Sequence, residues 1–317
     1  MNFIKNFFTA ALLTTVVTGP AFAEKPGNCP HPRSKPPLNC CGRFNVSADF
    51  LFFKPCQGAF LTCSFGSSDT VISTDNETTT TTIFANDIEV PYRWDGGFRI
   101  GAGYEFGRGC IELSAAWTRF HTNAHGTSNL FWKLDFDVLD FALSRKISVN
   151  PCFYWEPFIG VRTVWIKQNL DVVYVNTTDN NGMISKTNVS ENTAQKLTGT
   201  GPVFGTLADW SLGCGFGVYA LGDLGIIYGR FKRTVDGLET TEDSEDTTRF
   251  GTDRARCASI VALDGGIGIR WKKCFCDCVL LTLKLGYEFH HYFDYNLINT
   301  TGDLSLNGGS VSATLEF

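Results

Sequence analysis

Apolar and polar side chains alternate with a period of two along most of this chain. From Val279 to Phe289 every second residue is Val, Leu, Tyr or Phe, and the residues between them include Lys284 and Glu288. Aromatic and aliphatic residues likewise alternate with Asn, Ser and Asp from residue 44 to residue 50. Successive side chains of a strand point to opposite faces. Each such segment therefore predicts a strand with one apolar face and one small, polar or charged face.

Repeated along the chain, this pattern predicts about ten strands, within a range of eight to twelve. They span roughly residues 43–54, 95–106, 110–121, 129–144, 153–174, 197–208, 212–232, 254–271, 276–292 and 303–317. In the fourth strand Lys133, Asp135 and Asp137 share one face and Asp140 falls on the other, which predicts a β-bulge near Leu139.

The strands of a soluble β-sandwich also alternate apolar and polar residues, so this pattern alone does not distinguish a sandwich from a membrane β-barrel. The lengths of the connections between strands do. Long connections lie near residues 55–94, 121–128, 176–196, 234–252 and 294–303, and short ones near 107–109, 146–151, 209–211 and 272–275. The longest has room for another hairpin, through residues 60–65 and 82–90. Short periplasmic turns and long external loops are typical of outer-membrane barrels, whose even strand number places both termini in the periplasm. We therefore predict an all-β fold, a transmembrane antiparallel up-and-down β-barrel.

The N-terminus has the features of a secretory signal peptide. Lys5 precedes an apolar run at residues 7–17, and Ala21 and Ala23 form a small-x-small cleavage pattern. The apolar run is too short to span a bilayer. We expect a signal peptide at 1–23, a proline- and cysteine-rich periplasmic tail at 24–41, and a barrel at 42–317 in the bacterial outer membrane.

Composition narrows the function classes. The 27 basic residues against 32 acidic ones give a net charge of −5, which excludes a nucleic-acid partner bound by bulk charge. Twelve cysteines would be a redox liability in the cytosol. The sequence contains no G-x-S-x-G, P-loop or H-E-x-x-H motif, so we assign no catalytic residue, enzyme activity or cofactor. Cysteines at 274, 276 and 278 do not have zinc-site spacing, so we assign no metal.

The polar faces of the strands would line the lumen. By parity the acidic lumen residues are Asp49, Glu105, Glu112, Asp135, Asp137, Glu156, Asp223, Asp264 and Glu288, and the basic ones are Arg99, Lys133, Arg162, Arg270 and Lys284. The acidic excess and the glycines on the same faces favour a small water-filled pore with a mild cation preference. The alternative is an interior plugged by salt bridges, because small barrels are filled by side chains. The protein would then be a non-conducting structural or adhesive barrel.

The last strand ends in an apolar row of Val311, Ala313, Leu315 and Phe317. A final amphipathic strand with a C-terminal Phe looks like the signal that the barrel-assembly machinery reads. We therefore expect that machinery and outer-membrane lipid as partners.

On this strand map nine cysteines gather near the periplasmic end. They are Cys29, Cys40, Cys41, Cys110, Cys152, Cys214, Cys274, Cys276 and Cys278, while Cys56, Cys63 and Cys257 lie toward the outer loops. We favour a mixture in which some of these thiols bridge neighbouring proteins. Disulfides within the chain that link the tail to the rim are the alternative, which the even total permits.

Several segments resemble the major outer membrane proteins, or porins, of the Legionella and chlamydia-like type. They are ADFLFFK at 48–54, WEPFIGVRTVWI at 155–166, LGIIYGRF at 224–231, GYEFHHYF at 286–293 and the closing LSLNGGSVSATLEF. The resemblance implies an abundant β-barrel porin that lets small solutes and ions diffuse passively. It also implies an envelope stiffened by disulfides, in which the chain bridges to copies of itself or to other envelope proteins. The larger chlamydial relatives have more strands than this chain shows, which leaves the pore size open.

Overall fold

The computed structural model describes residues 42–58, 72–75, 78–81, 90–107, 110–126, 130–180, 183–241, 247–275, 279–296 and 302–317. The predicted signal peptide, periplasmic tail and residues 60–65 lie outside these ranges. The barrel strands are β1 (Arg43–Gly58), β4 (Asp95–Phe106), β5 (Ile111–His125), β6 (Phe131–Arg145), β8 (Phe153–Asn180), β9 (Met183–Gly213), β10 (Phe216–Thr241), β11 (Thr247–Phe275), β12 (Val279–Asn296) and β13 (Gly302–Glu316). Three short strands are β2 (Ile72–Asp75), β3 (Thr78–Thr81) and β7 (Ile147–Asn150).

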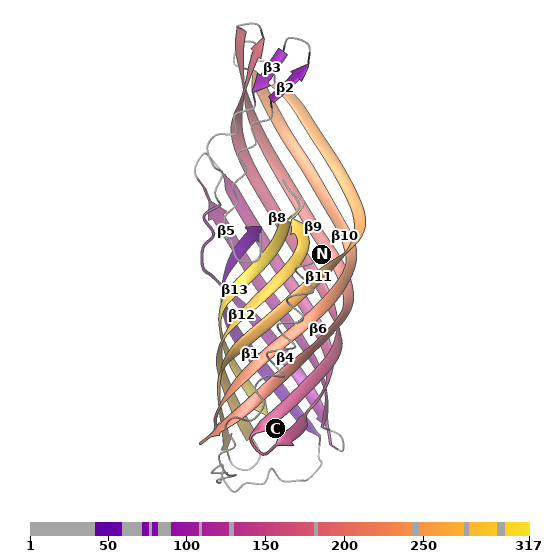
Figure 1. Ribbon diagram of the computed structural model, residues 1–317, viewed down its shortest axis with the longest axis vertical. Helices are drawn as coiled ribbons and strands as arrows, with labels where there is room; N and C mark the ends of the chain where they lie inside the picture. The colour runs from indigo at the N-terminus through magenta and orange to yellow at the C-terminus, as the bar shows by residue number, and fades with distance from the viewer. Residues whose placement is uncertain are drawn as a thin grey trace.

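The ten long strands form a closed antiparallel barrel in which each strand pairs with its neighbours along the chain (Figure 1). The ring closes where β1 pairs with β13, from Asn45 opposite Glu316 to Gly58 opposite Asp303. Phe44 and Phe317 complete this ladder by exchanging backbone hydrogen bonds of 2.8 and 2.9 Å. Closure removes the unpaired edges that a sheet would otherwise expose to lipid. The predicted fold class is therefore confirmed, with ten strands.

Strands β8 to β11 are longer than predicted and rise above the ends of β12 and β13 in Figure 1. The segments 176–196 and 234–252 were expected to be loops, but they are paired strands up to Asn180 opposite Met183 and Thr240 opposite Thr247. This prediction was wrong because these extensions are rich in Thr, Asn and Ser. They can form strands without showing the apolar alternation of a lipid-facing segment.

One short turn differs from prediction. The turn expected at 209–211 lies at Cys214 and Gly215, whose φ angles of 51° and 85° form a left-handed turn that suits glycine. In the long first connection the structure describes the hairpin β2–β3, and the hairpin expected through 60–65 and 82–90 lies outside the described residues except for Val90. The β2–β3 hairpin pairs with the far end of β8, with Thr78 opposite Asn180.

Strand β6 has the opposite inner face from the one predicted. Its buried side chains are Trp132, Leu134, Phe136 and Val138, so Lys133, Asp135 and Asp137 lie on the outer face. No β-bulge occurs at Leu139, because the pairing of β6 with both neighbours is continuous. The prediction failed because it assumed a polar interior along the whole strand, whereas this part of the interior is apolar.

A belt of large apolar side chains covers the outer face of the barrel. Phe50, Ile267, Leu285 and Val311 are 53–66% exposed. Large continuous apolar patches are rare on the surface of soluble proteins, and they mark interaction sites, including membrane contacts. No helix in the described part of the chain is long and apolar enough to cross a membrane.

Candidate functional site: the barrel lumen

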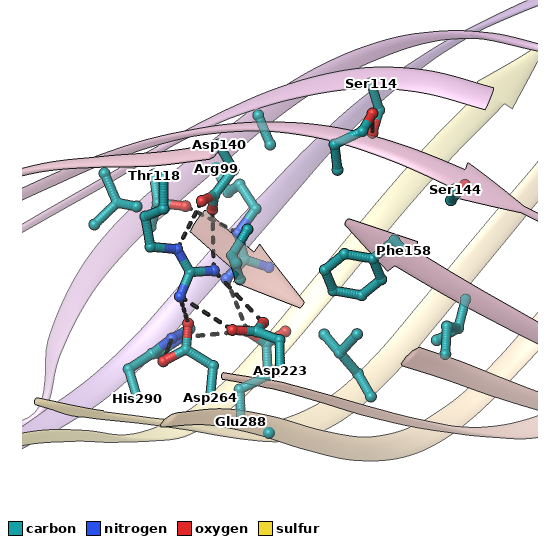
Figure 2. A pocket seen from close by; sticks show the side chains of 18 of the residues that line it. Arg99, Ser114, Thr118, Asp140, Ser144, Phe158, Asp223, Asp264, Glu288 and His290 are labelled. Carbon is teal, nitrogen blue, oxygen red and sulfur yellow. Dashed lines mark hydrogen bonds and ion pairs between the residues drawn. The ribbon is translucent and has the colours of Figure 1, made fainter. Parts of the chain in front are cut away.

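Arg162 of β8 is the centre of an ionic cluster that crosses the lumen. Its carboxylate partners Asp140, Asp223 and Asp264 are labelled in Figure 2. The Nε of Arg162 lies 2.6 Å from Oδ1 of Asp140, and its Nη1 lies 3.1 Å from Oδ1 of Asp223 and 2.5 Å from Oδ2 of Asp264. These carboxylates come from β6, β10 and β11. The side chains of Arg162, Asp223 and Asp264 are only 5–6% exposed. One guanidinium therefore links three other strands across the interior.

A second arginine extends the cluster to the opposite wall. Arg99 of β4 contacts Glu288 of β12 at 2.9 Å and Asp49 of β1 at 3.2 Å, and its Nε donates to Thr118 at 3.0 Å. His290 lies between the two halves, with Nδ1 3.2 Å from Asp264 and Nε2 3.6 Å from Glu288. Five carboxylates thus surround two guanidinium groups and one imidazole.

A cavity of about 260 Å³ lies against this cluster and extends toward the short turns. Ser114, Ser144 and Glu156 line its far part, and Ser144 donates a hydrogen bond of 2.6 Å to Glu156. Charged and hydroxyl groups share this lining with apolar side chains such as Phe158, Leu207 and Leu221. A cavity of this size with several polar groups in its wall can hold water molecules. The half of the barrel toward the short turns therefore contains a polar vestibule.

Further ion pairs line the wall between the cluster and the short turns. Lys146 contacts Glu112 at 3.0 Å and Glu105 at 3.3 Å. Arg270 and Lys272 both contact Asp209. In a separate contact, the ammonium group of Lys284 lies 5.5 Å from the ring centre of Tyr219. Most of the lumen charges have a partner.

On the other side of the cluster the interior is largely apolar, with Gln57, Gln168 and Gln195 as buried polar side chains among the apolar ones. The next inward residues are Leu51 and Phe53 on β1 after Asp49, and Val164 and Ile166 on β8 after Arg162. We call the buried set on this side the apolar plug. It comprises Leu51, Phe53, Val90, Tyr92, Phe120, Ala124, Leu130, Trp132, Leu134, Phe136, Val138, Val164, Ile166, Leu170, Leu197, Ile227, Phe231, Ile260, Ala262, Tyr292, Tyr295, Leu304 and Leu306, all 0–7% exposed. Side chains from around the ring meet here as they do in a protein core.

The structure brings together most of the predicted lumen residues and adds several that the sequence reasoning missed. Asp49, Arg99, Arg162, Asp223, Asp264 and Glu288 meet in the central cluster, Glu105 and Glu112 meet at Lys146, and Arg270 meets Asp209. The missed members are Asp140, Lys146, Asp209, Lys272 and His290. The even parity of Asp140 was visible in the sequence, but it was explained by a bulge. Lys146, Asp209 and Lys272 were placed in turns.

Three of the predicted periplasmic cysteines, Cys110, Cys214 and Cys274, are free and exposed. Cys110 and Cys214 occupy turns, and Cys274 lies near the end of β11. Cys152 has an interaction partner, so it is not one of the free cysteines. Cys29, Cys40, Cys41, Cys276 and Cys278 lie outside the described residues.

Ser305, His291 and Asp303 form a hydrogen-bonded line between β12 and β13. Nδ1 of His291 lies 2.6 Å from Oγ of Ser305, and its Nε2 lies 3.2 Å from Oδ2 of Asp303. In Ser–His–Asp hydrolases the acid holds Nδ1 and the serine meets Nε2, which is the reverse order. His291 and Ser305 are also buried, at 0% and 4% exposure. The arrangement suits a structural link between the two strands.

Among the described residues, no group of three or more His, Cys, Asp or Glu side chains is arranged to hold a metal ion.

A closed antiparallel barrel with an apolar outer belt and a charged interior defines the class of outer-membrane β-barrels. The family model of the Legionella pneumophila major outer membrane protein precursor matches residues 39–313. The chain belongs to this family, and it is a bacterial outer-membrane protein. The comparison with curated proteins found no match.

The solved structures similar to this chain are distant. They include the outer membrane protease OmpT from Escherichia coli, at 8% identity and a TM-score of 0.37, covering 87% of this chain and 96% of that one. A Pseudomonas aeruginosa FadL homologue has 6% identity and a TM-score of 0.32, with 87% and 90% covered. The Pseudomonas putida toluene transporter TodX has 5% identity and a TM-score of 0.28, with 87% and 89% covered. At these values the alignments carry no argument about function.

Proposed function

We propose that this protein is a structural, non-enzymatic barrel of the outer membrane, closed in the conformation described here. In this proposal the short turns and both ends of the barrel segment face the periplasm. The observation that carries the proposal is the apolar plug, whose side chains are 0–7% exposed across the external half of the interior. An ion crossing this region would lose its hydration among side chains that are mostly apolar, at a high cost in free energy.

The small cation-preferring pore expected from the sequence stays a prediction, and it is the second candidate. The polar vestibule of about 260 Å³ and the excess of carboxylates around Arg99 and Arg162 favour it. Passive diffusion through this barrel would require the plug side chains to move. The two candidates therefore differ in whether the resting barrel is permeable.

Swelling of liposomes in an isotonic solution of a small sugar tests whether the lumen is closed, because liposomes swell when the sugar enters through a pore. Liposomes carrying refolded protein are expected to swell no faster than protein-free liposomes, because the plug leaves no continuous polar path. Heat-modifiable migration on a gel verifies that the reconstituted barrel is folded. Swelling that increases in proportion to folded protein would favour the porin candidate.

The proposal also gives the rim cysteines a mechanical role. Cys110, Cys214 and Cys274 are free and exposed at the short-turn end of the barrel, which in our orientation faces an oxidising compartment. Disulfides from this rim to neighbouring envelope proteins or to other copies of this chain would link the barrel into a covalent network.

Thiol-blocked envelopes analysed on non-reducing gels test this role. We expect high-molecular-weight species that collapse to monomer on reduction, and the triple variant C110S/C214S/C274S should weaken them. C257S is the matched control, because Cys257 is also free and exposed but lies on the external part of β11. Cross-linking that depends on Cys257 and not on the rim would contradict the proposal.

A further inference from the structure

Three lysines form a row on the outer face of the barrel. Lys167 of β8 is directly opposite Lys196 of β9, which is directly opposite Lys232 of β10. All three are exposed, and their chain neighbours Ile166, Leu197 and Phe231 are buried in the plug. We call this row the lysine ladder.

Like charges directly opposite on adjacent strands are destabilising, because their Cβ atoms lie only about 5 Å apart. The ladder places two such pairs side by side, and the only ion pair among its members in the described structure is the exposed contact of Lys232 with Asp253 at 3.1 Å. Arg230, also exposed, precedes Lys232 on the same face of β10. Asp135 of β6 is directly opposite Lys167. Lys196, in the middle of the ladder, has a lysine opposite it on both sides, so the four positive charges outnumber the acidic residues beside them.

The neighbouring sector of the outer face, on β5 and β6, is arranged differently. There Arg119 is opposite Asp137, with a contact of 3.8 Å, and His121 is opposite Asp135, with a contact of 2.6 Å. Cross-strand partners in this sector carry opposite charges, as sheet stability favours. The like-charged ladder is thus a local departure that a bound anion would relieve.

The position of the ladder identifies the kind of anion. Two residues before Lys167 is Trp165, and two residues before Arg230 is Tyr228, and both rings are exposed on the outer belt. Because a strand rises about 3.3 Å per residue, the ammonium groups lie just beyond the aromatic rim of the belt. Interfacial aromatic rings mark the level of lipid headgroups. A ligand bound here would meet apolar surface on one side and positive charge on the other.

We propose that the lysine ladder binds the phosphate groups of a phosphorylated, acylated glycolipid of the outer leaflet, whose acyl chains lie along the belt beside Trp165 and Tyr228. The assignment to the outer leaflet rests on the orientation given in the proposed function. Each phosphate would accept charge-assisted hydrogen bonds from two lysines, so the lipid would hold β8, β9 and β10 together at the membrane surface.

Native mass spectrometry of the full barrel in neutral detergent micelles tests the site. The probes are bisphosphorylated lipid A, dephosphorylated lipid A and inorganic phosphate. Wild-type protein should retain bisphosphorylated lipid A, and K167Q/K196Q should weaken its binding about tenfold or more. The matched control R119Q/K133Q removes two positive charges from the sector where charges are paired, and its binding should stay within about twofold of wild type.

Equal binding of dephosphorylated lipid A, or wild-type affinity in K167Q/K196Q, would overturn the proposal. Displacement of the lipid by equimolar inorganic phosphate would also overturn it, because the site would then be one for a free anion. Binding in micelles depends on neither lumen closure nor orientation. An inverted orientation would be detected by surface labelling of intact cells, and an open lumen by flux measurements. Failure of either part of the proposed function is therefore distinguishable from failure of the lipid site.

Discussion

At the scale of single residues, Arg162 forms ion pairs with more residues than any other described side chain of the lumen. It contacts three carboxylates from three other strands while its own side chain is 6% exposed. A buried charge network is strongly destabilised when one member is removed, because the remaining charges lose their compensation. Arg162 is therefore expected to matter more for folding than any arginine on the outer face.

The variant R162Q tests this expectation. It should lower the free energy of unfolding by about 3–5 kcal/mol, measured by urea titration in lipid vesicles, since it leaves Asp140, Asp223 and Asp264 without their guanidinium. R119Q is the control, because Arg119 is half-exposed and contacts Asp137 at 3.8 Å. Its loss should be about 1 kcal/mol or less. Equal losses in the two variants would show that the central cluster is not a folding element.

The sequence predicted most of these lumen residues by parity alone. Asp49, Arg99, Arg162 and Glu288 lie in strands whose alternation is unambiguous, and all four belong to the central cluster. Their mutual contacts were not predictable, because which arginine reaches which carboxylate depends on the stagger of strands far apart in the sequence. Lys133, Asp135 and Asp137 were misplaced because they lie beyond the apolar belt, where the outer face meets water.

At the scale of elements, the first and last strands decide whether the barrel exists. β13 pairs with β12 on one side and with β1 on the other, and Phe317 makes the last two backbone hydrogen bonds of the seam with Phe44. Their rings also lie 5.4 Å apart on the outer face. The predicted row of Val311, Ala313, Leu315 and Phe317 is exposed on that face, where the closing strand would meet lipid and the assembly machinery.

Deletion of Phe317 should therefore block assembly but not export. The truncated chain is expected to accumulate in the periplasm and to lose the heat-modifiable form on gels, because the seam lacks its terminal pair. F317Y, which keeps the backbone and the ring, is the control and should assemble normally. Normal heat-modifiable migration of the truncated protein would sink the idea that Phe317 is part of the assembly signal.

Element lengths were harder to predict than element positions. The lipid-facing part of each strand has a clear apolar period, so all ten were located. Strands β8 to β11 continue past this part, where Thr and Asn occupy both faces and periodicity no longer distinguishes a strand from a loop. The stability of these extensions comes from cross-strand pairing, such as Thr234 opposite Asp253, which a pattern along one strand does not reveal.

At the scale of the whole molecule, the interior is divided into two zones by the ionic cluster. The polar vestibule extends from the cluster toward the short turns and also touches Phe136, Val138 and Tyr292 of the apolar plug, whose other members lie on the other side of the cluster. Several inner faces change from charged to apolar at the same level, as at Asp49 and Leu51 on β1 and at Asp264 and Ala262 on β11. A ten-stranded barrel is only slightly wider than the eight-stranded barrels that side chains can fill. The proposal of a closed lumen therefore rests on the strand number together with the apolar residues at these positions.

Ion conductance across planar lipid bilayers tests the closed lumen most directly. Wild-type protein is expected to insert without steady conductance steps, whereas W132A/F136A, which removes two large plug side chains, should conduct. The control F50A/F52A removes two aromatic rings from the outer face instead and should stay closed. Stable, uniform conductance steps from the wild-type protein, at a frequency that follows the amount of folded barrel, would contradict the account.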